Sequence, residues 1–389
     1  MKRKLPKEIF ALQFAVIMTF SSLAILNLMP LFLEHLGGTP RQIGLIIGIF
    51  SFAAFVFRPF GGWILGRVEA KKILILGLFI QFVATCLYLL LTNLSGFVFF
   101  IRILHGFGFS IFIIAALLIT VNLTNQEQRT YALGVVSSGF VLPLLLLPFL
   151  GERIIARFGF DEFFLLAVVL TLIPLIYLFF VKFPSLPSGV SEEKMKAPGV
   201  LRLLARRKIL VIVLLTLLFE LTLAIGLTFV PLLAHRSSGM MAGYYYSFLA
   251  LVAVFLRLYA GKRLRFWGRP ELILPAFAFL SIGALILYFS VSNWHLIVSG
   301  LIWGLGVGIL YPHLSALVVS GVTSRERSRI LGIFAASVDL GFALGPMLFG
   351  FVSQSLGVRE SFPILAGGMF VLTLFLIFIG RRDLFTRHV

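Results

Sequence analysis

Long apolar runs separated by short polar intervals dominate the chain. A helix that crosses the hydrocarbon core of a bilayer needs about 20 mostly apolar residues, and twelve runs come close to that length or exceed it. These runs cover residues 9–33, 43–65, 73–91, 97–121, 131–150, 163–181, 209–234, 240–260, 272–291, 296–320, 330–352 and 362–380. The pattern predicts an all-α membrane protein with twelve transmembrane helices.

The longest polar interval, residues 183–208, separates the sixth run from the seventh. It is rich in Pro, Gly and basic residues, which is typical of a flexible cytoplasmic linker. We therefore expect an N-terminal six-helix bundle over 1–182 and a C-terminal six-helix bundle over 209–389. Within the linker, the segment "VLRLLARR" has the composition of a short interfacial helix.

The two halves share a pattern of Gly, Pro and Arg residues at a nearly constant spacing. The matched positions are Pro30 with Pro231, Arg58 with Arg257, Gly62 with Gly261, Gly106 with Gly304, Gly108 with Gly306, Arg129 with Arg327, Gly134 with Gly332 and Pro148 with Pro346. Matches in constant order through consecutive elements are hard to obtain by chance. They predict two pseudo-symmetric bundles related by an axis along the membrane normal.

Composition and charge agree with a membrane location. The chain is 60% hydrophobic and only 12% charged, and its mean hydropathy is +1.08. The net charge of +18 could indicate nucleic-acid binding, but 25 of the 33 Lys and Arg residues lie in the tails and loops of one side and 5 in those of the other. This asymmetry predicts a multi-pass protein of the cytoplasmic (inner) membrane with both termini in the cytoplasm. A nucleic-acid partner is therefore not expected.

Several other classes of protein lack the necessary residues. The single cysteine, Cys86, excludes an intrachain disulfide and a multi-cysteine metal site, so no metal or cofactor is expected. The first run is longer than a signal-peptide core and lacks a small-residue cleavage site, which predicts a retained helix. "HGFGFS" lies inside a run and no Lys follows it, so no phosphate-binding loop is present. The scattered ionisable groups do not form the cluster that a membrane-embedded enzyme would need.

A few ionisable side chains lie inside the runs, where each costs several kcal/mol unless it faces protein or water. Arg102 and His105 are three residues apart on one helical face, so we expect them to face a cavity or a neighbouring helix. Glu220 lies near the middle of the seventh run, and Asp339 lies about a third of the way into the eleventh. For all four residues, a role in proton coupling and a purely structural role both remain open.

Three motifs resemble those of the major facilitator superfamily of transporters: "RPFGGWILGR", "RILHGFGFS" and "DLGFALGPMLFG". The resemblance covers essentially the whole chain and is closest to bacterial drug and sugar efflux permeases. It implies that helices 1, 4, 7 and 10 line a central cavity and that helices 3, 6, 9 and 12 face lipid. There are departures, because the family's acidic residue in the first motif is Gly66, and Glu69 and Ala70 also differ from the family pattern.

The resemblance and the charges together predict a secondary active transporter, a proton-coupled exporter of a small amphiphilic or aromatic molecule, and not an enzyme. A proton-coupled nutrient symporter and a lipid or lysolipid flippase are the alternatives. Expected partners are the substrate, protons and membrane lipid, and the protein is expected to be a monomer. Candidate substrate contacts are Gln13, Asn27, Glu220, Trp303, Tyr311 and His313. Candidate gating residues are Arg58, Gly62, Arg67, Arg257 and Gly261.

Overall fold

The computed structural model describes residues 5–183, 199–263 and 269–385, except 65–67 and 238. Within these ranges the chain is helical and has no strand, which confirms the predicted fold class. Eleven stretches are long and apolar enough to cross a membrane, and the described part of a twelfth, Ala242–Arg257, is shorter. The twelve predicted runs each coincide with one of these stretches.

The helices group into two compact units, one made of Met1–Gly38 with Ile49–Val190 and the other of Thr39–Gly48 with Ser191–Val389. The first nine residues of the second long helix, Pro40–Gly48, thus belong to the second unit. There, the backbone at Gly44 lies directly against the carbonyl of Pro346, and Gly350 lies against Pro40. The predicted domain limits, 1–182, 183–208 and 209–389, stay a prediction, and most of the linker lies outside the described residues.

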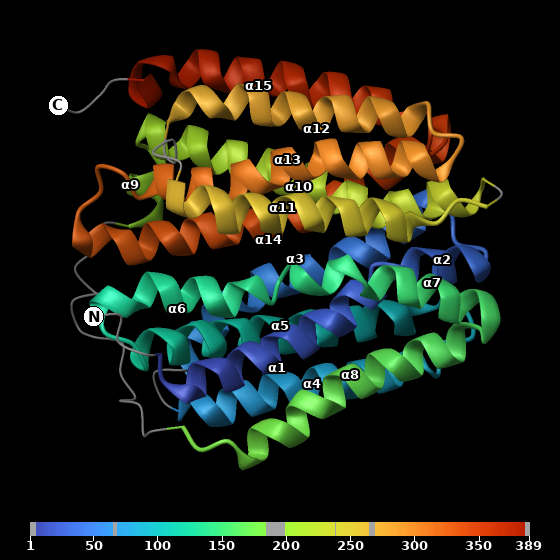
Figure 1. The fold of residues 1–389 in the computed structure, drawn as a ribbon, viewed down its shortest axis with the longest axis horizontal. Coiled ribbons are helices and arrows are strands. Elements are labelled where there is room, and N and C mark those ends of the chain that lie inside the picture. Colours follow the sequence, from blue (N-terminus) through green and yellow to red (C-terminus); the bar gives the residue numbers. More distant parts are fainter. Residues whose placement is uncertain (1–4, 65–67, 184–198, 238, 264–268, 386–389) are drawn as a thin grey trace. The chain divides into compact units, whose positions relative to one another are not determined.

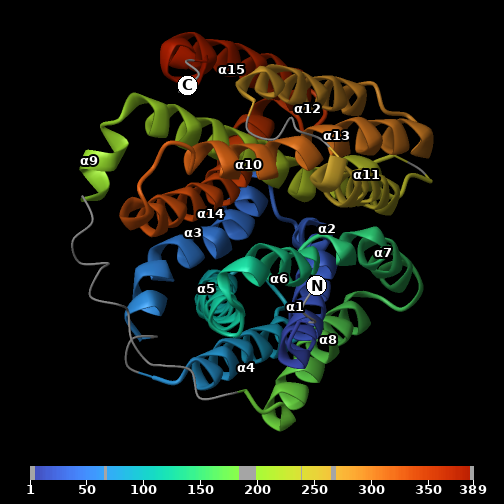
Figure 2. The same cartoon turned by 60° about the vertical axis from the view of Figure 1, so that its left-hand side comes forward.

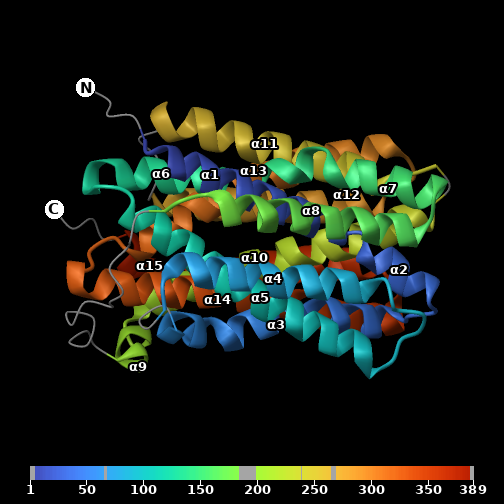
Figure 3. The same cartoon turned by 90° about the horizontal axis from the view of Figure 1, so that it is seen from below.

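Two of the apolar runs in the first unit, the first and the fifth, are interrupted near proline, whereas the second and the sixth continue as helices through Pro59 and Pro174. Its elements are α1 (Lys7–Leu26), α2 (Met29–His35), most of α3 (Pro40–Ile64), α4 (Ala70–Tyr88), α5 (Gly96–Asn122), α6 (Gln126–Ser138), η1 (Leu142–Leu145), α7 (Leu147–Arg157) and α8 (Phe160–Phe180). The first run breaks just before Pro30, because proline provides no backbone donor and is tolerated in the first turn of a new helix. The fifth run breaks at Pro143 and Pro148, and α6 and α7 therefore lie end to end (Figure 3).

The second unit contains longer, continuous helices. Its elements are α9 (Val200–Leu204), α10 (Arg207–His235), α11 (Ala242–Arg263), η3 (Pro270–Leu272), α12 (Ile273–Tyr288), α13 (Asn293–Val318), α14 (Ser324–Leu356) and α15 (Ser361–Phe385). Figure 1 shows α15, α12 and α13 as successive neighbours in this unit. Pro231 matches Pro30 in the sequence, yet α10 continues through it. The short helix α9 falls where "VLRLLARR" predicted one.

Each unit is built by the same scheme of helix contacts. In the first unit α4 packs on α5 and α8, and α1 packs on α8 and α6. In the second unit α12 packs on α13 and α15, and α10 packs on α15 and α14. Figure 2 shows α5 with α1, α3, α4 and α6 around it. The predicted repeat therefore corresponds to a repeated packing pattern.

Matched glycines also make close crossings between helices in each unit. Gly106 of α5 lies directly against the backbone carbonyl of Phe50 in α3, and a Cβ atom on Gly304 of α13 would lie 2.6 Å from the carbonyl of Leu249 in α11. Both pairs bring two helix backbones together where any side chain would clash. The shared glycine pattern in the sequence thus marks equivalent helix crossings.

Several helices expose continuous apolar faces. On α8 the exposed apolar side chains include Leu165, Val169, Ile173, Ile176 and Phe180, which recur every three to four residues and so share one side of the helix. On α15 the exposed residues include Ile364, Val371, Phe375 and Phe378. Large apolar faces without charged residues are what a lipid environment requires.

Candidate functional site

Glu220 lies close to the midpoint of α10 and is only 2% exposed. Its neighbour is α14, because a Cβ atom built on Gly341 would come within 2.8 Å of Glu220 Cβ. The carboxyl atom Oε1 is buried and has no hydrogen-bond partner among the described residues. A buried carboxyl oxygen without a partner is costly in a structural role alone, since burying an unpaired polar atom costs about 1–3 kcal/mol.

Two other charged residues of the second unit interact electrostatically with Glu220. Asp339 of α14 is 7% exposed, and Arg257 of α11 is half-buried. The Arg257 guanidinium lies over the ring of Tyr311, 5.5 Å from its centroid. The structure thus collects four predicted site residues, Glu220, Asp339, Arg257 and Tyr311, from four helices of one unit.

Asp339 lies deeper in its helix than the sequence indicated. The helix α14 begins at Ser324, so Asp339 is near its middle, although it remains about a third of the way into the apolar stretch Arg329–Leu356. The additional turns at the start of α14 are polar, and a capping box made by Thr323 and Glu326 stabilises them. Apolar content alone therefore underestimates the length of this helix.

Trp303 is fully buried on α13, where its ring meets that of Tyr245 on α11 edge-on at 5.6 Å. Trp303 Nε1 and Tyr245 Oη are both buried and have no hydrogen-bond partner among the described residues. Both side chains pack against Gly226 of α10. Sequence analysis missed Tyr245, which stands in a run of three tyrosines at the start of α11, and no local signal in the sequence distinguishes it from its two neighbours.

Arg102 and His105 form a buried cluster with Tyr88 and Phe50 in the first unit. Arg102 Nη1 donates to Tyr88 Oη at 3.4 Å, and the same oxygen lies 3.2 Å from His105 Nδ1. Phe50 of α3 stacks on the guanidinium at 4.7 Å and meets the His105 ring edge-on at 5.0 Å. The pair therefore contacts neighbouring helices, which was one of the two predicted alternatives, the other being a cavity. His105 Nε2 has no hydrogen-bond partner among the described residues.

The remaining candidate substrate contacts are spread over both units. Gln13 Nε2 donates to Ser138 Oγ at 3.1 Å and so joins α1 to α6. Asn27 is half-buried at the break that ends α1. His313 is fully buried on α13 and lies within hydrogen-bonding reach of the backbone of Arg269, which places it beside the segment that precedes α12. Gln13 and Asn27 therefore belong to the first unit and His313 to the second.

The candidate gating residues lie at the ends of α3 and α11. Arg58 is half-buried near the end of α3, and Gly62 falls in the last turn of that helix. Gly261 falls in the last turn of α11. Arg67 lies outside the described residues. Glu69, which departs from the family pattern, makes an exposed ion pair with Lys72 at 3.7 Å.

Charged residues also connect the start of α10 to α14, to α15 and to the segment that follows α13. Arg206 pairs with Glu326 at the start of α14, Arg207 Nε lies 3.9 Å from Asp383 Oδ2 of α15, and Lys208 Nζ donates to Ser320 Oγ at 3.0 Å after α13. Hydrogen bonds from Arg206, together with bonds from Thr323, hold the pKa of Glu326 below its ordinary value of 4.5.

No set of three His, Cys, Asp or Glu side chains suited to holding a metal ion occurs in the part of the chain that the structure describes. The chemistry that this arrangement offers is therefore that of individual charged and aromatic groups. Buried carboxyl, guanidinium and imidazole groups can exchange protons or bind polar parts of a ligand when water or a ligand reaches them.

Comparison with known proteins gives consistent matches over nearly the whole chain. A family model described as "Major Facilitator Superfamily" matches residues 9–322 and 264–387. The staphylopine export protein of Staphylococcus aureus is 26% identical over 394 residues, covering 98% of this chain and 98% of that protein. The multidrug resistance protein MdtG of Salmonella choleraesuis is 25% identical and covers 88% of this chain and 87% of its own length.

Solved structures of transporters share the fold. A crystal structure of a mutant of the nucleoside transporter NupG superposes with a TM-score of 0.80 at 14% identity, covering 95% of this chain and 99% of that chain. A bacterial homologue of the human lysosomal transporter Spinster, in an inward-facing and unoccupied conformation, gives a TM-score of 0.79 at 16% identity over 98% of each chain. At such low identities the likeness establishes the fold alone.

Proposed function

The chain belongs to the Major Facilitator Superfamily and is a multi-pass membrane transporter, and from this premise we propose that it exports a small amphiphilic or aromatic molecule in exchange for protons. Transport would proceed by alternating access, in which the two bundles rock about a site near the bilayer midplane. We expect a monomer in the cytoplasmic membrane, with both termini in the cytoplasm and lipid around α4, α8, α12 and α15.

Two kinds of relative support the export direction. The staphylopine export protein is named for export, and MdtG is named for multidrug resistance, which export of drugs would explain. They match this chain over most of its length, and the match to the first includes both bundles. The "DLGFALGPMLFG" segment of α14, which resembles the exporter pattern, places Gly341 and Gly345 against α10 beside Glu220.

The observation that carries proton coupling is the buried carboxyl group of Glu220, whose Oε1 atom has no hydrogen-bond partner among the described residues. It lies about 20 Å from either end of α10 at 1.5 Å per residue, a depth that water could reach from either side as the bundles rock. Asp339 lies nearer the end of its apolar stretch that is predicted to be cytoplasmic. Glu220 is therefore the better candidate for a proton carrier, and Arg257 is the nearby cation that could respond to its charge.

The aromatic rings near this carboxyl group support an amphiphilic or aromatic substrate. Tyr311 is 37% exposed and packs edge-on against Phe334 with 5.9 Å between ring centroids. The Arg257 guanidinium also lies over its ring. A ring that is partly open beside a cation could bind an apolar ring and a polar group of the same molecule.

Transport into everted membrane vesicles tests the proposal. Ethidium, an amphiphilic aromatic cation, is the first probe, and a thermal-shift screen of the purified protein with sugars, metal chelates and lysolipids extends the search for a substrate. Accumulation should be saturable, and it should collapse when an uncoupler removes the pH gradient. Accumulation that does not depend on the pH gradient would exclude proton coupling. Movement of the substrate in the same direction as the protons would instead establish symport.

The assignment of the proton carrier rests on a pair of variants. Glu220→Gln keeps the shape of the side chain but cannot titrate, so net pH-driven transport should fail while substrate exchange at equal concentrations continues. Asp339→Asn should change the rate of transport and keep its dependence on the pH gradient. Normal proton-coupled transport by the Glu220→Gln protein would refute the assignment.

A further inference from the structure

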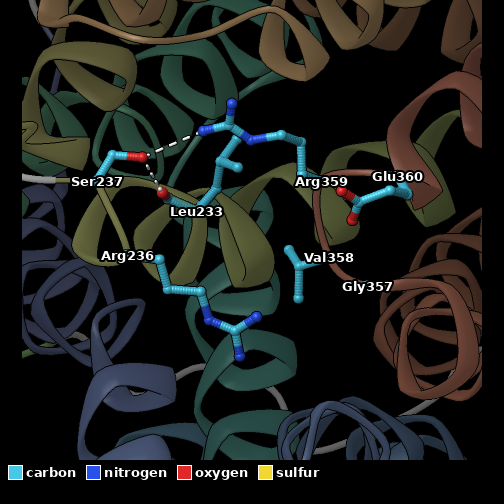
Figure 4. Close-up of a pocket in the computed structure, with 7 residues that line it drawn as sticks. All are labelled: Leu233, Arg236, Ser237, Gly357, Val358, Arg359 and Glu360. Carbon is cyan, nitrogen blue, oxygen red and sulfur yellow. Dashed lines mark hydrogen bonds between the residues drawn. The ribbon is translucent and has the colours of Figure 1, made fainter.

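A pocket of about 250 Å³ lies at one end of the second unit, where α10 ends and α14 turns into α15. Figure 4 shows the residues that line it, which come from two segments far apart in the sequence. Leu233, Arg236 and Ser237 belong to the end of α10, and Gly357–Glu360 form the turn before α15. None of these residues was singled out by the sequence, and the proposed transport mechanism does not use them.

Arg359 is fixed in place without using all its hydrogen-bonding capacity. Its Nη2 atom donates to Ser237 Oγ at 3.1 Å, which joins the turn to α10. A guanidinium has five N–H donors in a rigid fork, so one such bond leaves donors for a carboxylate. The pocket also lies beside the first turn of α15, whose N-terminus carries a partial positive charge.

Glu360 supplies the opposite charge at a separate corner of the pocket. Its Oε2 atom folds back over Gly357, which has a positive φ of 98° and no side chain to obstruct the carboxylate. Glu360 makes no hydrogen bond or ion pair with any residue that the structure describes. Figure 4 shows the Arg359 guanidinium beside Ser237, while the Glu360 carboxylate points back toward the turn.

The cations at this end of the unit are concentrated in the pocket. The loops predicted to lie on the outer side of the membrane hold only five Lys and Arg residues, and two of them, Arg236 and Arg359, line it. Between the charged groups, Leu233 and Val358 provide apolar wall and are both almost fully buried. The lining thus combines two cationic groups, one acidic group and an apolar surface in a small volume.

We propose that this pocket binds a small zwitterion that carries a carboxylate and a cationic amine, as a free amino acid does. The carboxylate would take the spare donors of Arg359, the amine would pair with Glu360, and a short apolar side chain would lie on Leu233 and Val358. A simple anion would leave the Glu360 carboxylate unpaired, and a simple cation would leave the Arg359 donors unused, so neither matches the whole lining. The proposal concerns binding on one unit and does not rest on proton-coupled export.

The test uses the full-length protein, purified in detergent, and three matched probes. Leucine has both charges, N-acetyl-leucine lacks the amine charge, and leucine amide lacks the carboxylate. In thermal-shift titrations leucine should give a saturable increase in melting temperature, and each derivative should bind at least about tenfold more weakly, the equivalent of about 1.4 kcal/mol. The absence of a saturable shift with leucine would overturn the proposal.

Two variants distinguish recognition of the zwitterion from a structural effect. Arg359→Gln should abolish the leucine shift. Glu360→Gln should reverse the preference, so that N-acetyl-leucine binds at least as well as leucine, a change that mere loosening of the turn would not produce. Arg153→Gln in α7 of the other unit is the control and should bind all three probes like the unmodified protein.

Two results would contradict the assignment even if some binding occurred. One is a Glu360→Gln protein that still prefers leucine over N-acetyl-leucine. The other is a protein whose melting temperature does not change with leucine but rises when phosphatidylethanolamine is added to phosphatidylglycerol nanodiscs. That result would mean that the pocket binds a lipid headgroup with the same pair of charges and not a free solute. All these experiments measure binding, so their results can be interpreted even if the protein proves not to export the proposed substrate.

Discussion

Gly341 of α14 lies directly against Glu220 of α10, so that a Cβ atom at position 341 would come within 2.8 Å of Glu220 Cβ and of the carbonyl oxygen of Leu217. Replacing Gly341 with alanine should therefore separate the two helices locally. Overpacking of this kind costs about 1–3 kcal/mol, of which about 0.5–1 kcal/mol is offset by the better helix propensity of alanine. We expect a lower melting temperature and weaker coupling of transport to the pH gradient.

Gly332 is the matched control in the same helix. A Cβ atom there would meet nothing within 4 Å, so Gly332→Ala should leave the melting temperature unchanged or raise it slightly. If the two alanine variants had equal melting temperatures, the close approach of α10 and α14 would be wrong.

Two adjacent tyrosines at the start of α11 make a second matched pair. Tyr246 Oη donates to the carbonyl oxygen of Leu227 at 2.6 Å, whereas Tyr245 Oη is buried without a partner among the described residues. Tyr246→Phe should lose a net hydrogen bond worth about 0.5–1.5 kcal/mol and leave a carbonyl unsatisfied. Tyr245→Phe should cost nothing or stabilise the protein, because it removes an unsatisfied buried hydroxyl group.

Thermal unfolding of both phenylalanine variants measures the difference. A loss of stability in Tyr245→Phe equal to that in Tyr246→Phe would mean that a bound water or ligand satisfies the Tyr245 hydroxyl group. The same result would draw attention to Trp303 Nε1, the unpartnered donor whose ring packs against Tyr245.

Individual helices could be predicted from the sequence because a membrane span depends on local composition. The effect of proline was less predictable. The chain breaks before Pro30 but continues through the matched Pro231, since the outcome depends on whether neighbouring helices stabilise the freed carbonyl groups. The length of α14 was also underestimated, because its polar first turns are stabilised by capping and not by lipid.

The candidate site was predictable only where its residues are close in the sequence. The spacing of Arg102 and His105 places them on one face, but nothing local indicates that Tyr88 of α4 would bridge them. Tyr245 likewise looks like one more aromatic residue in an apolar run, and its unusual position becomes evident only beside Trp303 and Gly226. Contacts between helices depend on rotation and register, which hydropathy does not specify.

Replacing either of the matched glycines Gly106 and Gly304 with alanine should have the same effect on stability in the two units. Alanine at Gly106 would clash with the carbonyl of Phe50, and alanine at Gly304 with that of Leu249. Each replacement should lower the melting temperature and the yield of folded protein. Gly134→Ala, where a Cβ atom would meet nothing within 4 Å, is the control. A tolerated alanine at only one of the two crossings would show that the matched positions are not equivalent in packing.

The ion pair between Arg206 and Glu326 gives a prediction about pH. Because the folded protein holds the pKa of Glu326 below its ordinary value of 4.5, the ionised carboxylate contributes stability that is fully present above that value. The contribution is lost as the pH falls through the lower pKa of the folded state. Glu326→Gln should therefore melt at a lower temperature than the unmodified protein at neutral pH, and the difference should shrink as the pH is lowered toward about 4.

The neighbouring basic residue Arg207 provides the comparison. Its pair with Asp383 is long, at 3.9 Å, and both side chains are largely exposed, so Arg207→Gln should change the melting temperature little at any pH. Arg206→Gln should reproduce the effect of Glu326→Gln, and combining the two should add little to either alone, because both remove the same interaction. Fully additive losses in the double variant would show that the two residues act separately, with Glu326 stabilising the start of α14 through Thr323 alone.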